Sequence, residues 1–250
     1  MSKIRRLFVG VFEYIPAARW CFTLFVVSFI SVVSIHKYID LADTAVFSAF
    51  EIMFLTLTDI VNIVFVYLPL YLFIICGIMF GESFGAAEIV RFKSRRNWLS
   101  GKAAAYFINT ILFFLAVIVI NIVVCGSVFS FSDVWSSDFV GFRVMMGQPS
   151  SDFSSGPGPV IVTACLSLFL YYLFCGVVNM VISLISGDEA AGLLASLFIG
   201  IFSGLINMTV TSSGFLAQIL RCGVFLILVV IVYILGIFIV GKQDLCSKRK

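Results

Sequence analysis

Long apolar runs without any charged residue dominate this chain. Two of them cover residues 60–80 and 103–131. A helix that crosses the hydrocarbon core of a bilayer needs about 20 apolar residues, whereas a soluble helix of that length would carry a polar face. Charged residues make up only 12% of the 250 residues, and they gather between the runs. We therefore expect an all-α, polytopic membrane protein that forms a single transmembrane domain over residues 1–250.

The apolar runs predict six transmembrane helices. They cover residues 20–35 (extending toward 39), 60–80, 103–128, 160–186, 190 to about 206, and about 222–240. The last two are separated because one helix over 190–240 would be far too long for a bilayer at ~1.5 Å per residue. We expect the break at 207–214, where Thr209, Ser212 and Gly214 favour a turn.

The segment 45–57 is apolar but short, and it contains Glu51. It predicts an interfacial or re-entrant helix before the second span, with Asp43 as its N-cap. A seventh span at this position is the alternative.

The basic residues decide between six and seven spans. Six spans place thirteen of the 16 Lys and Arg residues on the side of the two termini, and leave Lys37, Arg143 and Arg221 on the other. Seven spans would separate the basic loop 81–102 from the basic N-terminus. Because cytoplasmic loops are enriched in Lys and Arg, both termini and the tail 241–250 are expected in the cytoplasm, and the loop 129–159 outside.

Several kinds of chemistry are excluded by what the sequence lacks. His36 is the only histidine, which removes the paired-histidine zinc motif and any credible histidine-based triad. There is no Gly-rich phosphate-binding loop of the P-loop type and no basic-aromatic pattern for nucleic acid. We expect a protein that is not an enzyme and holds no cofactor of its own.

Two cytoplasmic segments have the pattern of surface helices. Apolar residues in 3–16 recur at spacings of three and four behind a basic start, which predicts an amphipathic helix lying on the membrane within residues 1–19. In the loop 81–102, Glu88 and Arg91 are three residues apart, and Phe92 and Trp98 supply apolar anchors. This combination suits docking onto a soluble partner, and the alternative is a positively charged connector.

The layout of the chain and the stretch 88–102 resemble the membrane subunit of a type-2 ABC transporter, in particular small bacterial members, many of which export peptides. The resemblance implies a coupling helix between the second and third spans. It also implies two copies of an ATPase subunit that binds ATP and Mg²⁺, and a second copy of this chain or a homologous permease. The residues assigned to ATPase coupling are Glu82, Glu88, Arg91, Phe92, Arg95 and Arg96. The expected location is the bacterial cytoplasmic membrane.

The chain departs from drug and polysaccharide exporters of that family in one respect. It lacks their longer Pro- and Gly-rich stretch between the fifth and sixth spans. An amphipathic or hydrophobic cargo, such as a peptide, is therefore expected. No charged residue sits at the centre of a span, which disfavours an ion-driven carrier and is consistent with a pump powered by an ATPase partner.

Small and polar residues recur inside the predicted spans. In the fifth span, Gly192, Ser196, Gly200 and Gly204 follow a four-residue spacing, which predicts close helix packing, a subunit interface or a translocation path. A polar stripe in the fourth span includes Asn179. Other candidates for a path lining are Asn62, Tyr67 and Tyr71 in the second span, with a kink expected at Pro69. The competing hypothesis is a non-transporting accessory or assembly protein of a membrane complex.

Overall fold

The computed structural model describes residues 17–41, 47–80, 95–146, 153–210 and 215–242. In these ranges it contains helices and no strand, so the all-α prediction is confirmed. The elements are α2 (Ala17–Leu41), α3 (Ala49–Thr58), the π-helix η1 (Val61–Tyr67), α4 (Leu68–Ile75), α6 (Arg95–Val128), α7 (Ser137–Met145), α8 (Pro157–Ser186), α9 (Glu189–Val210) and α10 (Phe215–Lys242). Five helices are long and apolar enough to cross a membrane, or six if α3 and η1–α4 form one bent span. The chain therefore has the features of a multi-pass membrane protein.

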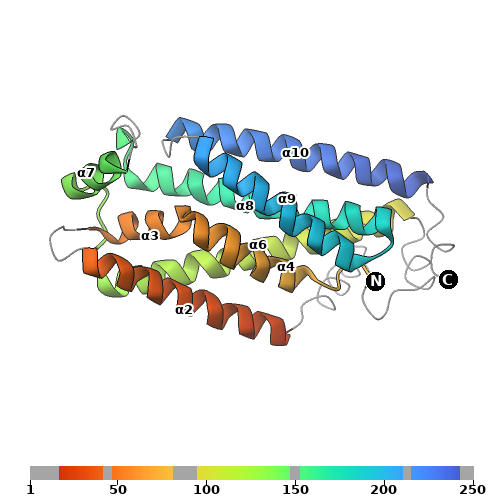
Figure 1. Cartoon of the computed structure of the whole chain (residues 1–250), viewed down its shortest axis with the longest axis horizontal. Helices are drawn as coiled ribbons and strands as arrows, with labels where there is room; N and C mark the ends of the chain where they lie inside the picture. The colour runs from red at the N-terminus through yellow and green to blue at the C-terminus, as the bar shows by residue number, and fades with distance from the viewer. Residues whose placement is uncertain (1–16, 42–46, 81–94, 147–152, 211–214, 243–250) are drawn as a thin grey trace, which may run out of the picture.

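The long helices form an elongated bundle in which successive elements run in opposite directions (Figure 1). The start of α2 and the end of α10 lie at one end of the bundle, which we call the basal end. The short helix α7 lies at the opposite end, which we call the α7 end (Figure 1). If α3 and η1–α4 count as one bent pass, the described residues contain up to six passes; otherwise they contain five.

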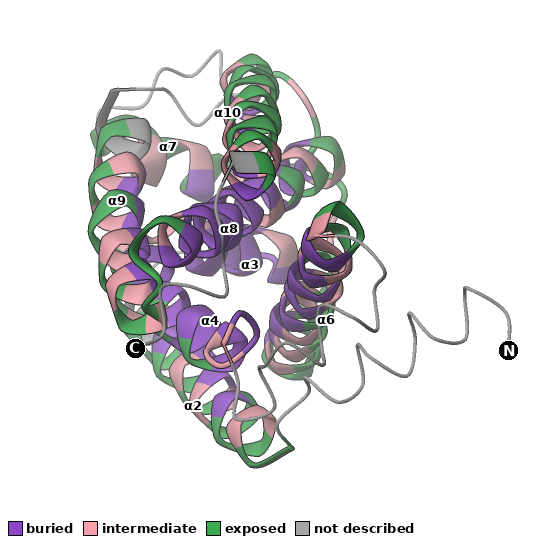
Figure 2. Cartoon of the chain, turned by 90° about the vertical axis from the view of Figure 1, so that its right-hand side faces the viewer, coloured by how far each residue is buried: buried purple, intermediate pink, exposed green. Residues whose placement is uncertain are grey.

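Helix α8 is the centre of the bundle. Most of its residues are buried, and α9 and α10 pack mainly against it, with α6 and α3 also in contact. Figure 2 shows the buried surface gathered around α8 and the exposed surface on the outside of the surrounding helices. Large apolar side chains such as Phe25, Leu115 and Phe202 are exposed there, as expected of side chains that contact lipid.

Helix α3 corrects two expectations for the segment before the second span. It lies inside the bundle, with Ile52, Phe54 and most of its other residues buried, so it does not lie on the surface as an interfacial helix would. The re-entrant alternative stays open, because the bent pair of α3 and η1–α4 is either a broken span or a re-entrant loop. Its N-cap is Ser48 rather than Asp43. At 10 residues, or ~15 Å, it is too short to be a seventh span of its own.

The second span is bent, but not at Pro69. The axis turns by 60° between α3 and η1–α4, where Asp59 ends α3 and accepts a hydrogen bond from the Val61 N–H at 2.9 Å. Pro69 lies in the first turn of α4, where the π-helix gives way to an α-helix. Because α4 continues η1 without a break, Pro69 lacks its N–H within a continuous helix, and the π-helical turns lie directly before it.

Other boundaries differ less from the prediction. α6 begins at Arg95, so residues 95–102 of the expected loop are the first two turns of a continuous helix of 34 residues. The loop 129–159 contains α7, which the sequence analysis did not predict. The expected break was 207–214. α9 extends into it and ends at Val210, and α10 begins directly after it, at Phe215. The expected surface helix at 3–16 lies outside the described residues, as do Glu82, Glu88, Arg91 and Phe92.

Candidate functional site

Asn179 and Ser183 of α8 lie in the core and are hydrogen-bonded within the chain. Asn179 donates from Nδ2 to the Tyr106 hydroxyl at 3.1 Å and accepts from Ser183 at 3.2 Å. The Tyr71 hydroxyl lies 2.8 Å from the Thr110 hydroxyl. All five groups are buried. Asn179 and Tyr71, predicted as helix-packing or path-lining residues, therefore link α8 and α4 to α6.

The small face of α9 packs inside the chain. A Cβ added at Gly200 would lie 2.6 Å from Leu68, and one at Gly204 would lie 2.7 Å from Val64. At Gly192 it would come within 2.8 Å of the backbone oxygen of Asn179. Ser196 is also buried and donates to the Gly192 carbonyl oxygen at 2.8 Å. The four residues are thus the contact surface of α9 with α8, η1 and α4, and they are not on an outer face.

Asn62 and Tyr67 bring the π-helix against α2 and α6. Asn62 Nδ2 donates to Ser34 Oγ at 3.2 Å. The Tyr67 hydroxyl faces Ser31 and Asn121 but makes no hydrogen bond within the described structure. Buried polar groups usually make a hydrogen bond, so this hydroxyl is an exception. It lies between α2, η1 and α6.

At the basal end, charged side chains hold the turn that follows α4. The Gly77 N–H donates to Glu189 Oε1 at 2.6 Å, and the Phe80 N–H donates to Oε2 at 3.4 Å. From the other side, Arg19 donates to the carbonyl oxygens of Cys76 and, at 3.3 Å, of Phe73. A cation from α2 and an anion from α9 therefore hold the last described turn before residues 81–94. We call this arrangement the basal clamp.

Local sequence explains why the clamp forms. Gly187 ends α8 in the left-handed region, at φ 73°, and its N–H donates to the Ser183 carbonyl oxygen at 2.9 Å. Glycine has no Cβ and adopts this conformation without strain, so the chain reverses sharply. Asp188 then accepts from the Ala190 N–H at 3.0 Å, which starts α9 and carries Glu189 in its first turn. Gly77, at φ 92°, makes the matching turn after α4.

At the α7 end, a buried carboxylate joins α3 to α7. Glu51 is 0% exposed. It accepts from the Ser48 N–H at 2.7 Å, from the Ser136 hydroxyl at 3.1 Å and from the Ser136 N–H. Ser136 is in turn the N-cap of α7. Trp135 stacks on Phe139 with ring centroids 4.9 Å apart, so polar and aromatic contacts together close this end of the bundle.

Of the six sequence-predicted coupling residues, the structure describes two. Arg95 and Arg96 begin α6, close to the basal end, and the other four lie outside the described residues. The sequence analysis missed Arg19 and Glu189 as partners in one site. The local signal was a basic residue before the first span and an acidic residue directly after a Gly-Asp turn. Nothing in the sequence says that both side chains reach the turn after α4. In the described part of the chain, no cluster of His, Cys, Asp and Glu is suited to a metal ion.

The comparisons with known proteins give no family. No protein-family model, no curated protein and no solved structure matches this chain. The functional argument therefore depends on the geometry above and on the resemblance of the sequence.

Proposed function

We propose that this chain is the membrane-spanning subunit of an ATP-driven exporter of the type-2 ABC class. A separate ATPase supplies the energy, and the cargo is amphipathic or hydrophobic, for example a peptide. Two permease copies enclose the path, since Asn179 and Tyr71, which were candidates to line a path within one copy, are hydrogen-bonded inside it. The membrane is the bacterial cytoplasmic membrane, with both termini on the cytoplasmic side.

The observation that best supports this function is the basal clamp. The segment 81–94 is the first part of the loop 81–102 that the sequence predicts as the docking surface; it follows Phe80 directly and leads into α6 at Arg95. Its first anchor is the turn held by Arg19 and Glu189. A displacement of the segment would therefore pull on α2, α4 and α9 at one side and on α6 at the other. A docking loop that drives a transport cycle requires such a connection, because packed helices move as rigid units.

The distribution of charge supports the orientation. Arg19, Arg95 and Lys242 are on helix ends at the basal end, whereas Lys37 and Arg143 belong to the α7 end (Figure 1). Cytoplasmic ends of membrane proteins carry more basic residues, so the basal end faces the cytoplasm in this proposal.

The proposal predicts that an ATPase subunit is encoded next to this chain, and it is tested by binding to that ATPase. We expect Phe92→Ala and Glu88→Arg to leave expression unchanged, and to reduce recovery of the ATPase and uncouple hydrolysis from transport. Truncating a central aromatic anchor typically costs ~2 kcal/mol or more of binding. Lys248→Ala in the tail is the matched control and should bind normally. Equal ATPase recovery and transport in all three variants would refute the docking role, and the absence of any ATPase partner would favour an accessory protein.

A further inference from the structure

Polar side chains of α2 face polar side chains of the second span along one side of the bundle. Nearest the α7 end, Lys37 Nζ of α2 lies 3.8 Å from Asp59 Oδ2 at the bend. About one turn deeper, Ser34 Oγ accepts from Asn62 Nδ2 of η1 at 3.2 Å. The exposed fraction falls from 64% for the Lys37 side chain to 8% for Ser34. The contacts therefore lead from the exposed surface into the bundle.

One turn deeper again, three polar side chains meet without a hydrogen bond. The Tyr67 hydroxyl of η1 lies close to Ser31 of α2 and Asn121 of α6. Tyr67 Oη, Ser31 Oγ and Asn121 Oδ1 have no hydrogen-bond partner among the described residues, and the three residues are at most 1% exposed. Asn121 Nδ2 donates to the Val117 carbonyl oxygen at 2.8 Å, so the amide oxygen is the atom that lacks a partner. We call these three atoms the oxygen cluster.

The π-helix places both of its polar residues on the side of α2. Asn62 and Tyr67 are five residues apart. In an α-helix, with 3.6 residues per turn, two residues at this spacing point in quite different directions. The i→i+5 hydrogen bonding of a π-helix makes each turn wider, so that such residues lie closer to one face. η1 therefore aligns Asn62 with Ser34 and Tyr67 with Ser31.

The oxygen cluster lies at a depth where lipid offers no hydrogen bond. Asn121 precedes the end of α6 at Val128 by seven residues, which is ~10 Å along the helix. A hydrocarbon core is about 30 Å thick, so the cluster lies inside it when the end of α6 is at the boundary. A buried polar atom without a partner is unfavourable in any protein, and more so within a membrane. Three such atoms at one point therefore favour a bound guest.

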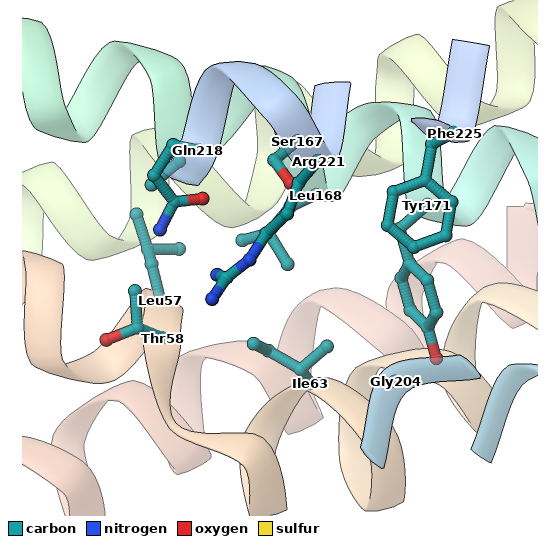
Figure 3. A pocket seen from close by; sticks show the side chains of 11 residues that line it. Leu57, Thr58, Ile63, Ser167, Leu168, Tyr171, Gly204, Gln218, Arg221 and Phe225 are labelled. Carbon is teal, nitrogen blue, oxygen red and sulfur yellow. The ribbon is translucent and has the colours of Figure 1, made fainter. Parts of the chain in front are cut away.

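The helices around the bend leave room for single water molecules. On the side of η1 that faces α8, a cavity of about 20 Å³ is lined by Thr58, Ile63, Gln218 and other residues. Figure 3 shows it between the bend and helices α8, α9 and α10. One water needs about 10–15 Å³ by the same measure. Packing around this bend is therefore not so tight as to exclude water, and the oxygen cluster lies on the other side of the same π-helix.

The oxygen cluster suits a small neutral guest rather than a cation. It contains no carboxylate, and Asp59, which lies toward the α7 end, is engaged by Lys37 and by the Val61 N–H. Hard cations prefer sites with several carboxylate or carbonyl oxygens. The two hydroxyls can each donate or accept, whereas the amide oxygen accepts only. Water can donate twice and also accept, and internal waters typically make about three hydrogen bonds. A single water therefore matches all three atoms.

We propose that the oxygen cluster binds one water molecule, which joins α2, η1 and α6. The water donates to Asn121 Oδ1 and Ser31 Oγ and accepts from the Tyr67 hydroxyl, so that all three atoms gain a partner. It reaches the site from the α7 end, past the two polar pairs described above. α2 is thus attached to the bundle partly through this water. The site is independent of any cargo or ATPase, so it stands apart from the proposed function.

The first test is the sign of a stability change in the purified full chain in detergent. If water pairs the Tyr67 hydroxyl, Tyr67→Phe removes a hydrogen bond and should lower the melting temperature by about 2–4 °C. If the hydroxyl has no partner, the same change removes an unfavourable buried group and should raise the melting temperature. Ser31→Ala should also lower it, and this variant serves if Tyr67→Phe does not fold. An unchanged or raised melting temperature in either variant would overturn the proposal.

The second test distinguishes a bound water from a direct bond between the side chains. Brief X-ray irradiation turns ordered water into hydroxyl radicals, which oxidise the side chains in contact with it. We expect oxidation of Tyr67, and its loss in Asn121→Leu, which removes an acceptor and fills the space. Tyr71 is the matched control, because it is 0% exposed and its hydroxyl lies 2.8 Å from that of Thr110, so it should stay unoxidised. No oxidation of Tyr67, equal oxidation of Tyr71, or oxidation that persists in Asn121→Leu would show that no water is bound there.

Discussion

The lack of a Cβ atom at three glycines of α9 allows this helix to approach its neighbours closely. Gly192, Gly200 and Gly204 bring the backbone of α9 against neighbouring side chains, with no space for a methyl group. In lipid, apolar surface gives helices no reason to associate, so association depends on such close packing and on hydrogen bonds. The spacing of the small residues predicted the contact, but it could not say which helix is the partner.

We expect Gly192→Ala to destabilise the protein by about 1–3 kcal/mol through overpacking. The added Cβ would come within 2.8 Å of the Asn179 backbone oxygen, which cannot move without moving α8. Gly223→Ala is the matched control, because a Cβ there meets nothing within 4 Å. It should be neutral or stabilising by up to ~1 kcal/mol. Thermal unfolding in detergent measures both, and similar melting temperatures for the two variants would show that α9 is not closely packed.

Glu51 is the residue on which the α7 end depends most. We expect Glu51→Ala to cost about 2 kcal/mol or more, because it leaves the buried N–H groups of Ser48 and Ser136 without their acceptor. Asp133→Ala removes an exposed carboxylate from the same region and should change stability by less than about 0.5 kcal/mol. Unfolding curves of the two variants that coincide would contradict the role assigned to Glu51.

Among the elements, the turn after α4 is the most strongly constrained. Its backbone N–H groups donate to one helix, and its carbonyl oxygens accept from another. The expected behaviour is a rigid anchor for the segment that follows.

We expect Glu189→Gln to speed amide hydrogen exchange at Gly77 and Phe80, because an amide oxygen is a weaker acceptor than a carboxylate and offers only one oxygen. Asp188→Asn, at the adjacent position, removes the same charge without touching this turn and should leave their exchange unchanged. Exchange measured by mass spectrometry on peptides that cover 76–80 distinguishes them. Equal exchange rates at Gly77 and Phe80 in both variants would mean that the turn does not depend on Glu189.

Elements were predictable where the signal is local. The N-cap of α3, Ser48, belongs to a Ser-x-x-Glu pattern that can be recognised in the sequence, although Asp43 was the expected cap. α7 was missed because its nine residues are held by contacts from distant positions, such as Glu51, which lies 85 residues before Ser136. The bend at Asp59 was missed for a similar reason, since Pro69 gave the more familiar signal.

For the whole molecule, the apolar runs predict which segments cross the bundle, but not which helices pack against each other. Apolarity does not single out the fourth run, because α6 and α10 are more apolar than the central helix α8. That place depends on small and polar residues such as Asn179 and Gly176, whose partners are on other helices.

The topology can be tested with cysteines introduced at Asp133 and Lys248 in a background without native cysteines. We expect an impermeant maleimide added to whole cells to label Asp133→Cys only, and to label Lys248→Cys only after the membrane is opened. Labelling of both positions from the same side would refute six passes with both ends in the cytoplasm.

The central position of α8 has a consequence for biosynthesis. Ribosomes deliver the chain from the N-terminus, so α3–η1–α4 and α6 are made before α8, the helix on which their inward surfaces pack. Until residue 186 has emerged, their buried polar groups, Tyr71 and Tyr106 among them, face a half-built bundle. The nascent protein therefore depends on the insertion machinery to keep these helices together, and a chain interrupted before α8 should be a preferred substrate for membrane proteases.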